Sequence, residues 1–200
     1  MGTTILVCNQ KGGTGKTMVS VHLAAWAAAK GMRAVAIDAD PQGSLANWHE
    51  RSKLAGLEFP DVLLLRPSLL RRDWAELTKR YEAIVIDTPP TASHLVEEFA
   101  PKVSTVVVPL LPSGLELHVL QAMLPLLPRD RLHLVLNRWD TTRTAREVRE
   151  AVEALELPMS VVRDYVAFRD AALYGGTVLS RYPHGNPAED IRNLGTKVWS

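Results

Sequence analysis

The sequence predicts a three-layer α/β fold, in which helices flank a mainly parallel central sheet. One observation is that short apolar runs alternate with longer segments whose apolar residues recur at helical spacing. Another is that several of these runs end at glycine- or aspartate-containing polar segments, where parallel α/β sheets form their ligand sites. The two patterns together place a ligand site at the carboxyl ends of the strands.

Length, composition and charge are those of a single globular domain. The chain has 200 residues, 46% of them hydrophobic and 22% charged, and its net charge is +1. This balance gives no general attraction for nucleic acid, so DNA binding would need a local basic patch. The only cysteine, Cys8, excludes an internal disulfide and a cysteine-based metal site, and we expect it to be a small buried residue.

We expect one domain over residues 1–200, located in the cytoplasm. The first apolar run begins near the N-terminus, which predicts no signal peptide and no added helix-turn-helix domain before the first strand. No apolar run approaches the length of about 20 residues that a membrane-spanning helix needs.

The first half of the chain alternates expected strands with expected helices. The strands are expected at residues 4–8, 33–38, 61–65 and 83–87, and the helices at 17–30, 44–53 and 69–80. The first helix carries an apolar stripe with Val19, Leu23 and Trp26, and Gly31 marks its end. We expect Ser44 to be the N-cap of the second helix.

The second half repeats the alternation and ends in a helical segment. Strands are expected at residues 104–110, 131–137 and 158–162, and helices at 114–127, 141–155 and 187–200, while residues 163–174 follow the last strand as a charged stretch leading into an alanine-rich segment. The last helix carries Ile191, Leu194 and Val198 but few basic residues. We therefore expect it to pack on the domain and not to dock on a membrane.

Residues 9–17, NQKGGTGKT, are the segment around which the chain is organised. They lie between a strand and a helix, which is the setting of a phosphate-binding loop (P-loop). Glycines let backbone N–H groups converge on a phosphate, and the helix start adds its own unpaired N–H groups. Lys16 is expected to contact the outer phosphates and the Thr17 hydroxyl to hold Mg²⁺. The predicted fold is therefore that of a P-loop NTPase domain.

Two further motifs place carboxylates at strand ends beside this loop. One is DADPQGS at residues 38–44, and the other is DTPP at residues 87–90. Asp38 and Asp87 are expected to hold Mg²⁺ through its bound water molecules. Asp40 is expected to orient the attacking water, because phosphoryl transfer depends mainly on positioning and charge stabilisation.

These motifs, in this order, resemble those of the ParA/MinD family of ATPases, especially the short ParA proteins related to plasmid ParF. Lys11 precedes Gly12 and Gly13, as in the family's deviant Walker A form, KGGxGK[ST]. The resemblance implies slow, partner-stimulated hydrolysis, with ATP and Mg²⁺ as cofactors. It also implies an ATP-bound homodimer that encloses two nucleotides. Lys11 of each subunit then reaches the nucleotide of the other, and Lys11 and Lys16 are catalytic residues together with Asp40.

The resemblance assigns ATP contacts to most of the loop, to the residue that follows it and to one distant residue. These residues are Lys11, Gly12, Gly13, Thr14, Gly15, Lys16, Thr17, Met18 and Asn137. Met18 is a departure, because relatives usually have Thr or Ser there, near the α-phosphate. The family's Asn at position 137 contacts adenine. A GTPase would instead use Asp140 of NRWD to read guanine, as in N-K-x-D, but Arg138 replaces the lysine and the other motifs favour ATP.

A basic stripe on the helix expected at residues 141–155 leaves two interpretations open. Arg143, Arg146 and Arg149 recur every third residue and could contact DNA phosphates without sequence preference. Arg138, Arg163 and Arg169 could extend this patch. However, a glutamate lies four residues after each arginine of the stripe, which predicts a solvated face of weak i,i+4 pairs.

The favoured interpretation is an ATPase that binds DNA non-specifically as an ATP-bound dimer and segregates plasmid or chromosomal DNA. It would be nucleoid-associated and act with a ParB-like or other small adaptor protein. One alternative is the same ATPase positioning a protein cargo, such as a chemoreceptor cluster or a microcompartment. Another is a MinD-like membrane-associated regulator, although no stable membrane association is expected. A metabolic P-loop enzyme would need a small-molecule substrate, and an iron protein of the nitrogenase type is excluded because it needs cluster cysteines.

Overall fold

The computed structural model describes residues 2–90 and 93–199, so the two ends of the predicted domain and residues 91 and 92 lie outside the description. In the described residues, seven strands form one sheet in the order β3-β2-β4-β1-β5-β6-β7, and all neighbouring pairs are parallel. The strands are β1 (Thr3–Val7), β2 (Ala34–Asp38), β3 (Asp61–Leu64), β4 (Ala83–Asp87), β5 (Thr105–Leu110), β6 (Leu132–Trp139) and β7 (Met159–Arg163).

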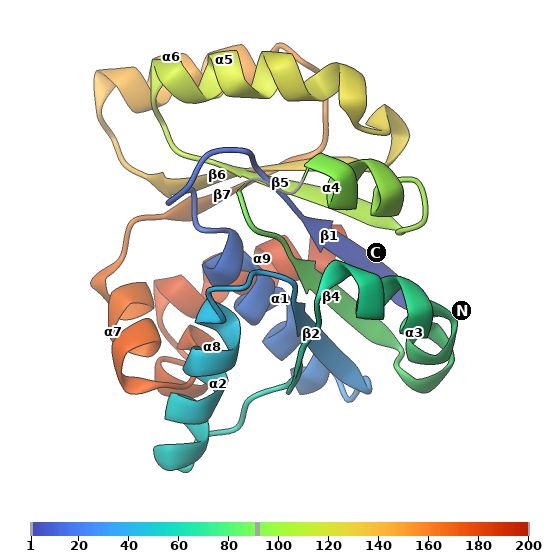
Figure 1. Ribbon diagram of the computed structural model, residues 1–200. Helices are drawn as coiled ribbons and strands as arrows, with labels where there is room; N and C mark the ends of the chain where they lie inside the picture. Colours follow the sequence, from blue (N-terminus) through green and yellow to red (C-terminus); the bar gives the residue numbers. More distant parts are fainter. Residues whose placement is uncertain (1, 91–92, 200) are drawn as a thin grey trace.

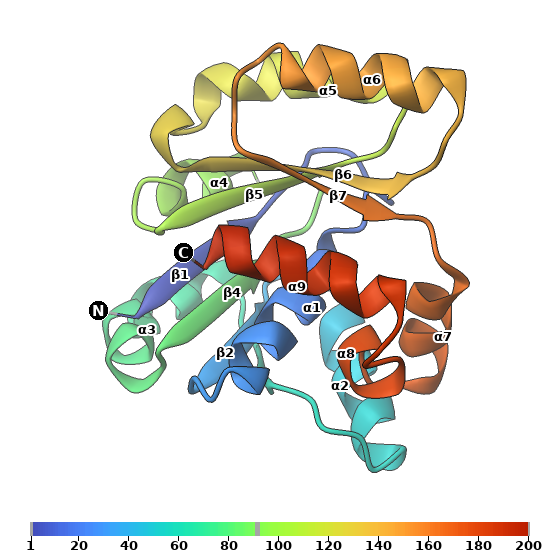
Figure 2. The same ribbon diagram turned by 180° about the vertical axis from the view of Figure 1, so that it is seen from behind.

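Helices cover both faces of the sheet, which confirms the predicted three layers (Figures 1 and 2). One face carries α3 (Pro67–Arg80), α4 (Ser93–Phe99), α5 (Gly114–Met123) and α6 (Arg143–Glu153). The other carries α1 (Lys16–Ala29), α2 (Ser44–Leu54), α7 (Val166–Tyr174), α8 (Val178–Arg181) and α9 (Asn186–Val198).

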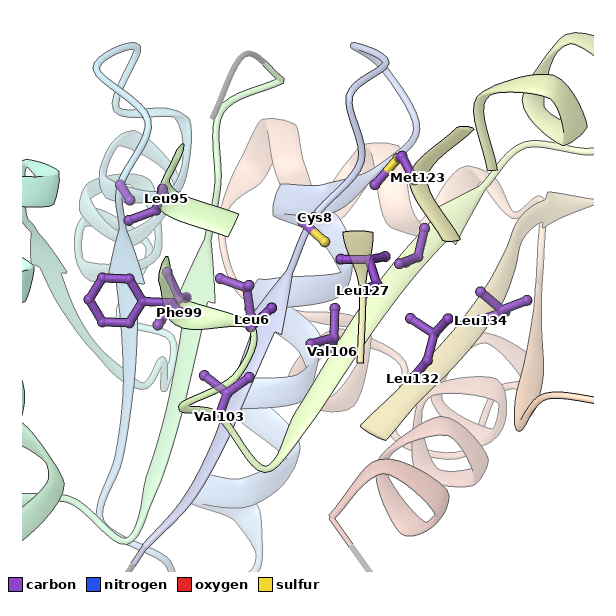
Figure 3. Close-up of a cluster of buried hydrophobic side chains, with 14 of the residues drawn as sticks. Leu6, Cys8, Leu95, Phe99, Val103, Val106, Met123, Leu127, Leu132 and Leu134 are labelled. Atoms are coloured by element: carbon purple, nitrogen blue, oxygen red, sulfur yellow. The ribbon is translucent and has the colours of Figure 1, made fainter. Parts of the chain in front are cut away.

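Each face has its own apolar core, because successive side chains of a strand point to opposite faces. In β1, Leu6 is buried under the α3–α6 face and its neighbour Ile5 under the face of α1 and α9. Figure 3 shows part of the first core, where Cys8 lies among leucines and valines. Cys8 is only 1% exposed, as predicted, and burial raises the pKa of its thiol to about 12.

The structure changes two details of the predicted helices. The helix expected at residues 114–127 ends as α5 at Met123, and a 3₁₀ turn (Leu124–Leu126) follows. Pro125 explains this end, because proline supplies no backbone N–H for a further helical turn. The short helices α4 and α8 are absent from the prediction.

The last helix, α9, packs on the domain, as predicted, and its neighbour there is α1. Ile191, Leu194 and Val198 are buried. Gly195 of α9 faces Trp26 of α1, and a Cβ there would be 2.5 Å from the ring of Trp26. In the described part of the chain, no helix is long and apolar enough to cross a bilayer.

Helix α2 is fixed to the turn between α7 and α8. The indole Nε1 of Trp48 donates to the carbonyl oxygen of Gly176 at 2.8 Å, and the N–H of Gly176 donates to Ser52 Oγ at 2.8 Å. Gly175 passes so close to the backbone of Arg51 that a Cβ there would be 2.7 Å from it. The segment that follows DADPQ is therefore anchored to the C-terminal third of the chain.

Candidate nucleotide-binding site

The register of the sheet brings the ends of β1, β2 and β4 together. Strand β4 lies between the other two, and Asp87 is level with Val7 on one side and with Asp38 on the other. Parallel strands end at the same edge of a sheet, so the P-loop after β1 meets both aspartates there. The three sequence motifs thus occupy one site.

The P-loop turns into α1 at Gly15, which is the N-cap of the helix and has a φ of 94°. No side chain caps the start of α1, so its first N–H groups can bind an anion. Asn137, near the end of β6, lies against the loop and donates from Nδ2 to the carbonyl oxygen of Thr14 at 2.8 Å. A Cβ at position 15 would overlap this nitrogen, so only glycine fits.

Lys16 lies inside the loop and is only 7% exposed. Its Nζ donates to the carbonyl oxygen of Lys11 at 3.1 Å. Burial lowers the pKa of Lys16, and the negative charges of Asp87 and Asp40 oppose that shift. An ammonium group has three donors, so Lys16 can also donate to phosphate oxygens.

Thr17 and Asp87 provide the place where a magnesium ion fits. The Thr17 hydroxyl donates to Asp87 Oδ2 at 2.7 Å, and the Ser20 hydroxyl donates to Oδ1 at 3.0 Å. Burial raises the pKa of the Asp87 carboxyl to about 7, and the two hydroxyls oppose that shift. Because the hydroxyl hydrogen of Thr17 points at Asp87, the lone pairs of the Thr17 oxygen remain available to a cation.

A magnesium ion here would take its other ligands from phosphate and water. In the described residues, no three His, Cys, Asp or Glu side chains are grouped closely enough to form a protein metal cage. Mg²⁺ commonly keeps several waters and binds one or two protein oxygens together with nucleotide phosphates. The residues present therefore fit a nucleotide-bound Mg²⁺.

Asp38, at the end of β2, caps helix α2. Its Oδ2 accepts hydrogen bonds from the N–H groups of Leu45 and Ala46, both at 3.0 Å. The N-cap position itself is Gly43, with a left-handed φ of 65°, so the prediction of Ser44 as N-cap is wrong. The capping oxygen comes from the preceding strand and not from the helix segment. Burial raises the pKa of Asp38, and these backbone N–H groups oppose the shift.

Asp40 follows in the loop and is more accessible than Asp38. Its own N–H donates to Asp38 Oδ1 at 3.1 Å, and its Oδ1 accepts from the N–H of Gln42 at 2.9 Å. Asp40 is half-buried, whereas Asp38 is fully buried. Of the two carboxylates, Asp40 is thus better placed to contact water, and Asp38 holds the loop in shape.

A pocket lies beside the P-loop, where a base contact is expected. It is lined by Asn137 together with Met18, Trp48, Asp164 and Tyr165. Oδ1 of Asn137 is buried and has no partner in the described residues, and Nδ2 is committed to the loop. The side-chain atom without a partner is therefore an acceptor. Adenine has an amino donor at its 6-position and guanine has a carbonyl oxygen there, so an acceptor facing that position would discriminate between the two bases.

Asp140, the residue that a GTPase would use, is held at a helix start. Its Oδ1 accepts from the N–H and from the hydroxyl of Thr142, at 2.9 and 2.6 Å. Thr142 is the N-cap of α6. Asp140 does not line the base pocket, so the geometry does not support guanine recognition by this residue.

Lys11 is paired with Glu116 of α5, a residue that the sequence analysis missed. Lys11 Nζ lies 2.8 Å from Glu116 Oε1, and the glutamate side chain is fully buried. Asn9 connects the same groups, because its Oδ1 accepts from the Lys11 N–H at 2.8 Å and its Nδ2 lies 3.4 Å from Glu116 Oε2. A glutamate among the leucines of GLELHVL is the signal that could have revealed it, since a buried carboxylate needs a partner.

The arginine stripe on α6 forms two of the expected i,i+4 pairs. Arg143 pairs with Glu147 at 2.7 Å and Arg149 with Glu153 at 2.8 Å. Arg146 lies between them, is exposed, and makes no ion pair within the described ranges.

The other candidate DNA contacts lie elsewhere on the molecule. Arg163 pairs with the buried Asp190 at 2.6 Å, and Arg169 lies 3.6 Å from Asp164. Arg138 and Arg169 line the base pocket.

Comparison with known protein families agrees with this geometry. The family described as CobQ/CobB/MinD/ParA nucleotide binding domain matches residues 5–178. The chain belongs to this family. Membership confirms the ParA/MinD resemblance.

Individual family relatives cover most of the chain. Maintenance of carboxysome distribution protein A from Gloeobacter kilaueensis is 36% identical over 88% of this chain and 83% of its own length. The chromosome-partitioning ATPase Soj from Thermus thermophilus is 27% identical over 97% and 94%.

Solved structures of the same fold are also similar. A ParA family ATPase from Chlorobium tepidum has a TM-score of 0.80 and 17% identity, covering 98% of this chain and 99% of that one. A putative plasmid partition protein from Borrelia burgdorferi bound to AMPPNP has a TM-score of 0.76 and 16% identity, covering 98% and 99%. At these identities the structures confirm the fold of this family member.

Proposed function

We propose that the chain is a Mg²⁺-dependent ATPase that dimerises around ATP, binds DNA non-specifically and positions an intracellular cargo. The observation that carries the proposal is the convergence of Lys16, the Thr17–Asp87 pair and Asn137 on one loop. These groups suit phosphates, a divalent cation and an adenine base, respectively.

Each residue has a defined part in this reaction. Lys16 and the N–H groups of the P-loop would bind the phosphates, and Asn137 would hold the base. Bound Mg²⁺ would neutralise charge on the transferred phosphoryl group. Thr17 would be its protein ligand, with Asp87 and Asp38 acting through water. Asp40, the more accessible carboxylate, would orient the attacking water.

The dimer follows from the resemblance carried by Lys11. In the proposed dimer, Lys11 of each subunit contacts the nucleotide of the other and completes that site. A small adaptor protein would stimulate the slow hydrolysis, as the family resemblance implies. Hydrolysis would then separate the subunits and release them from DNA.

The cargo we favour is a protein assembly, which reverses the order expected from the motifs alone. The relative named for carboxysome distribution is 36% identical to this chain, whereas Soj, named for chromosome partitioning, is 27% identical. Chromosomal or plasmid DNA is the second candidate, supported by the likeness to Soj over 97% of the chain.

A membrane-associated role finds less support in the C-terminal helix. The apolar side chains of α9 are buried against the domain, so they are not available to a lipid surface. We therefore propose a cytoplasmic, nucleoid-associated protein without stable membrane association.

The test is binding to non-specific duplex DNA with ATP, with ADP and without nucleotide, over a series of salt concentrations. The Asp40→Ala protein serves as the form that retains ATP. We expect binding only with ATP, and we expect it to weaken steeply with salt because phosphate contacts release counterions. Equal binding in all three states would contradict the ATP-dependent mechanism, and no binding in any state would contradict the DNA-based one.

A further inference from the structure

Glu116 is a buried carboxylate whose partner is the lysine that characterises this P-loop. The glutamate side chain is 0% exposed, the Lys11 side chain is 37% exposed, and the two charges are 2.8 Å apart. The lysine can turn toward solvent at small cost, whereas the carboxylate cannot be solvated where it lies. Separation of the pair therefore costs more free energy at Glu116 than at Lys11.

We propose that Glu116 is a positioning residue that holds Lys11 in its own subunit and opposes dimerisation until ATP is bound in both copies. This inference rests on the proposed function, in which Lys11 moves to the nucleotide of the partner subunit. In that movement the ammonium group leaves Glu116. The ion pair within one subunit and the contact between subunits thus compete for the same lysine.

Among the described residues, Lys11 is the ammonium group in direct contact with Glu116. Lys16 acts on the glutamate only through its charge: Glu116 raises the pKa of Lys16, but the Lys16 Nζ donates to the carbonyl oxygen of Lys11. The other nearby donor is Nδ2 of Asn9, which is 3.4 Å from Glu116 Oε2. This amide already donates to the carbonyl oxygen of Pro109 at 2.8 Å. A neutral amide shared between two acceptors does not balance a buried charge. Separation of the pair therefore has a free-energy cost that a neutral side chain at position 116 would remove.

The first experiment measures dimerisation of the Asp40→Ala protein by sedimentation velocity while ATP is titrated. The same measurement is made after adding Glu116→Gln, which keeps the size of the side chain and removes its charge. We expect the ATP concentration at the dimerisation midpoint to fall at least about tenfold, because a buried carboxylate no longer has to lose its paired charge. An unchanged or higher midpoint would overturn the proposal.

A matched control breaks a similar ion pair away from the loop. Asp190 is 7% exposed and lies 2.6 Å from Arg163, so Asp190→Asn also removes the buried charge of a carboxylate–cation pair. We expect this change to leave the ATP midpoint where it was. A tenfold shift there as well would show a general loosening of the domain and count against a specific role for Glu116.

A second variant pair tests the contact without dimerisation. Lys11→Ala removes the cation in direct contact with Glu116, so we expect it to lower the thermal unfolding midpoint of the nucleotide-free monomer. Adding Glu116→Gln to Lys11→Ala should restore that midpoint, because the uncompensated charge is gone. Failure to restore it would contradict the pairing. Glu116→Asp, which withdraws the carboxylate but keeps its charge, should lower the ATP midpoint less than Glu116→Gln does.

The two levels of the proposal fail differently. If the Asp40→Ala protein does not dimerise with ATP at all, the dimer mechanism itself is wrong, and this inference falls with it. If it dimerises but Glu116→Gln does not ease the process, only the role of Glu116 is overturned.

Discussion

The side-chain amide of Asn137 donates to the carbonyl oxygen of Thr14 at 2.8 Å, which ties the end of β6 directly to the P-loop. The same side chain lies where a Cβ on Gly15 would have to go. One contact between residues 123 positions apart therefore joins the P-loop to a residue that lines the pocket beside it.

Gly15→Ala should disrupt this contact. The methyl group would displace Asn137, and the positive φ of 94° would add backbone strain. We expect ATP affinity to fall at least tenfold and the domain to be destabilised by about 1–3 kcal/mol, measured by calorimetry and chemical unfolding. Gly13→Ala is the stability control, because position 13 also has a positive φ but has open space around it. Equal destabilisation by the two changes would show that the overlap with Asn137 is unimportant.

Substitutions of Lys16 and Asp40 should affect different steps, the first ATP binding and the second ATP hydrolysis. Lys16→Ala removes the buried ammonium, so we expect ATP affinity to fall at least about tenfold. Asp40→Ala should bind ATP normally but hydrolyse it at least about 100-fold more slowly, because the water is no longer oriented. Fluorescent-nucleotide titration and phosphate release measure the two effects. Unchanged binding in the first variant, or normal turnover in the second, would contradict the assigned roles.

Arg146 should contribute more to DNA binding than its neighbours on α6. It makes no ion pair within the described ranges, whereas Arg143 and Arg149 are paired with glutamates. We expect Arg146→Ala to weaken ATP-dependent DNA binding and to reduce the salt slope by about one. Arg80→Ala, an exposed change at the end of α3, is the control and should have no effect. If Arg146→Ala had the same salt slope of DNA binding as the parent, Arg146 would not contact DNA, and its face of α6 would be exposed only to solvent.

Because of His133, the free energy of unfolding should decrease in mildly acidic solution. Burial lowers the pKa of its imidazole from 6.5 to about 4, and the charge of Lys197 contributes. Between these two values the unfolded chain binds a proton that the folded chain does not, so stability is present above about pH 6.5 and is lost as pH falls toward 4.

His133→Gln should remove this titration and keep a hydrogen-bonding group opposite Ser160 Oγ, which lies 2.9 Å from Nε2. We expect the slope of unfolding free energy against pH to decrease by up to about 1.4 kcal/mol per pH unit. Burial also lowers the pKa of His22 to about 4, so part of the acid sensitivity should remain. His94→Gln, at a fully exposed side chain, should leave the slope as in the parent. The same slope in His133→Gln and the parent would contradict the assignment.

Gly195→Ala should destabilise the domain through the packing of α9 on α1. The added methyl group would lie 2.5 Å from the ring of Trp26, and a rigid indole cannot yield as a flexible side-chain end can. We expect a loss of about 1–3 kcal/mol in urea unfolding. Adding Trp26→Leu should recover part of the loss, because it makes room for the methyl group. An additive second loss would show that the two side chains do not meet.

Features that depend on contiguous residues could be predicted from the sequence. The P-loop is one such feature, because the conformation of NQKGGTGKT between a strand and a helix is determined mainly by its own residues. The position of Asp87 follows similarly from an apolar strand that ends in a carboxylate. Their meeting at one edge follows from the parallel sheet, in which β4 pairs with β1.

Features that depend on distant contacts could not be predicted. The cap of α2 comes from Asp38 on the preceding strand, so local N-cap preference pointed to Ser44 incorrectly. The partner of Lys11 is 105 positions away, and its helix is otherwise apolar on the buried side. The pairing of Arg163 with Asp190 likewise requires α9 to lie beside β7.

Because Cys8 is buried, a label can be attached to one introduced surface cysteine without replacing the native one. A thiolate is the reactive form of cysteine, and this thiol is both covered and held protonated by a pKa of about 12. A cysteine introduced on the surface would thus be the only thiol to react quickly with a maleimide dye. Distances between two copies could then be followed by energy transfer without first removing a residue from beneath the nucleotide loop.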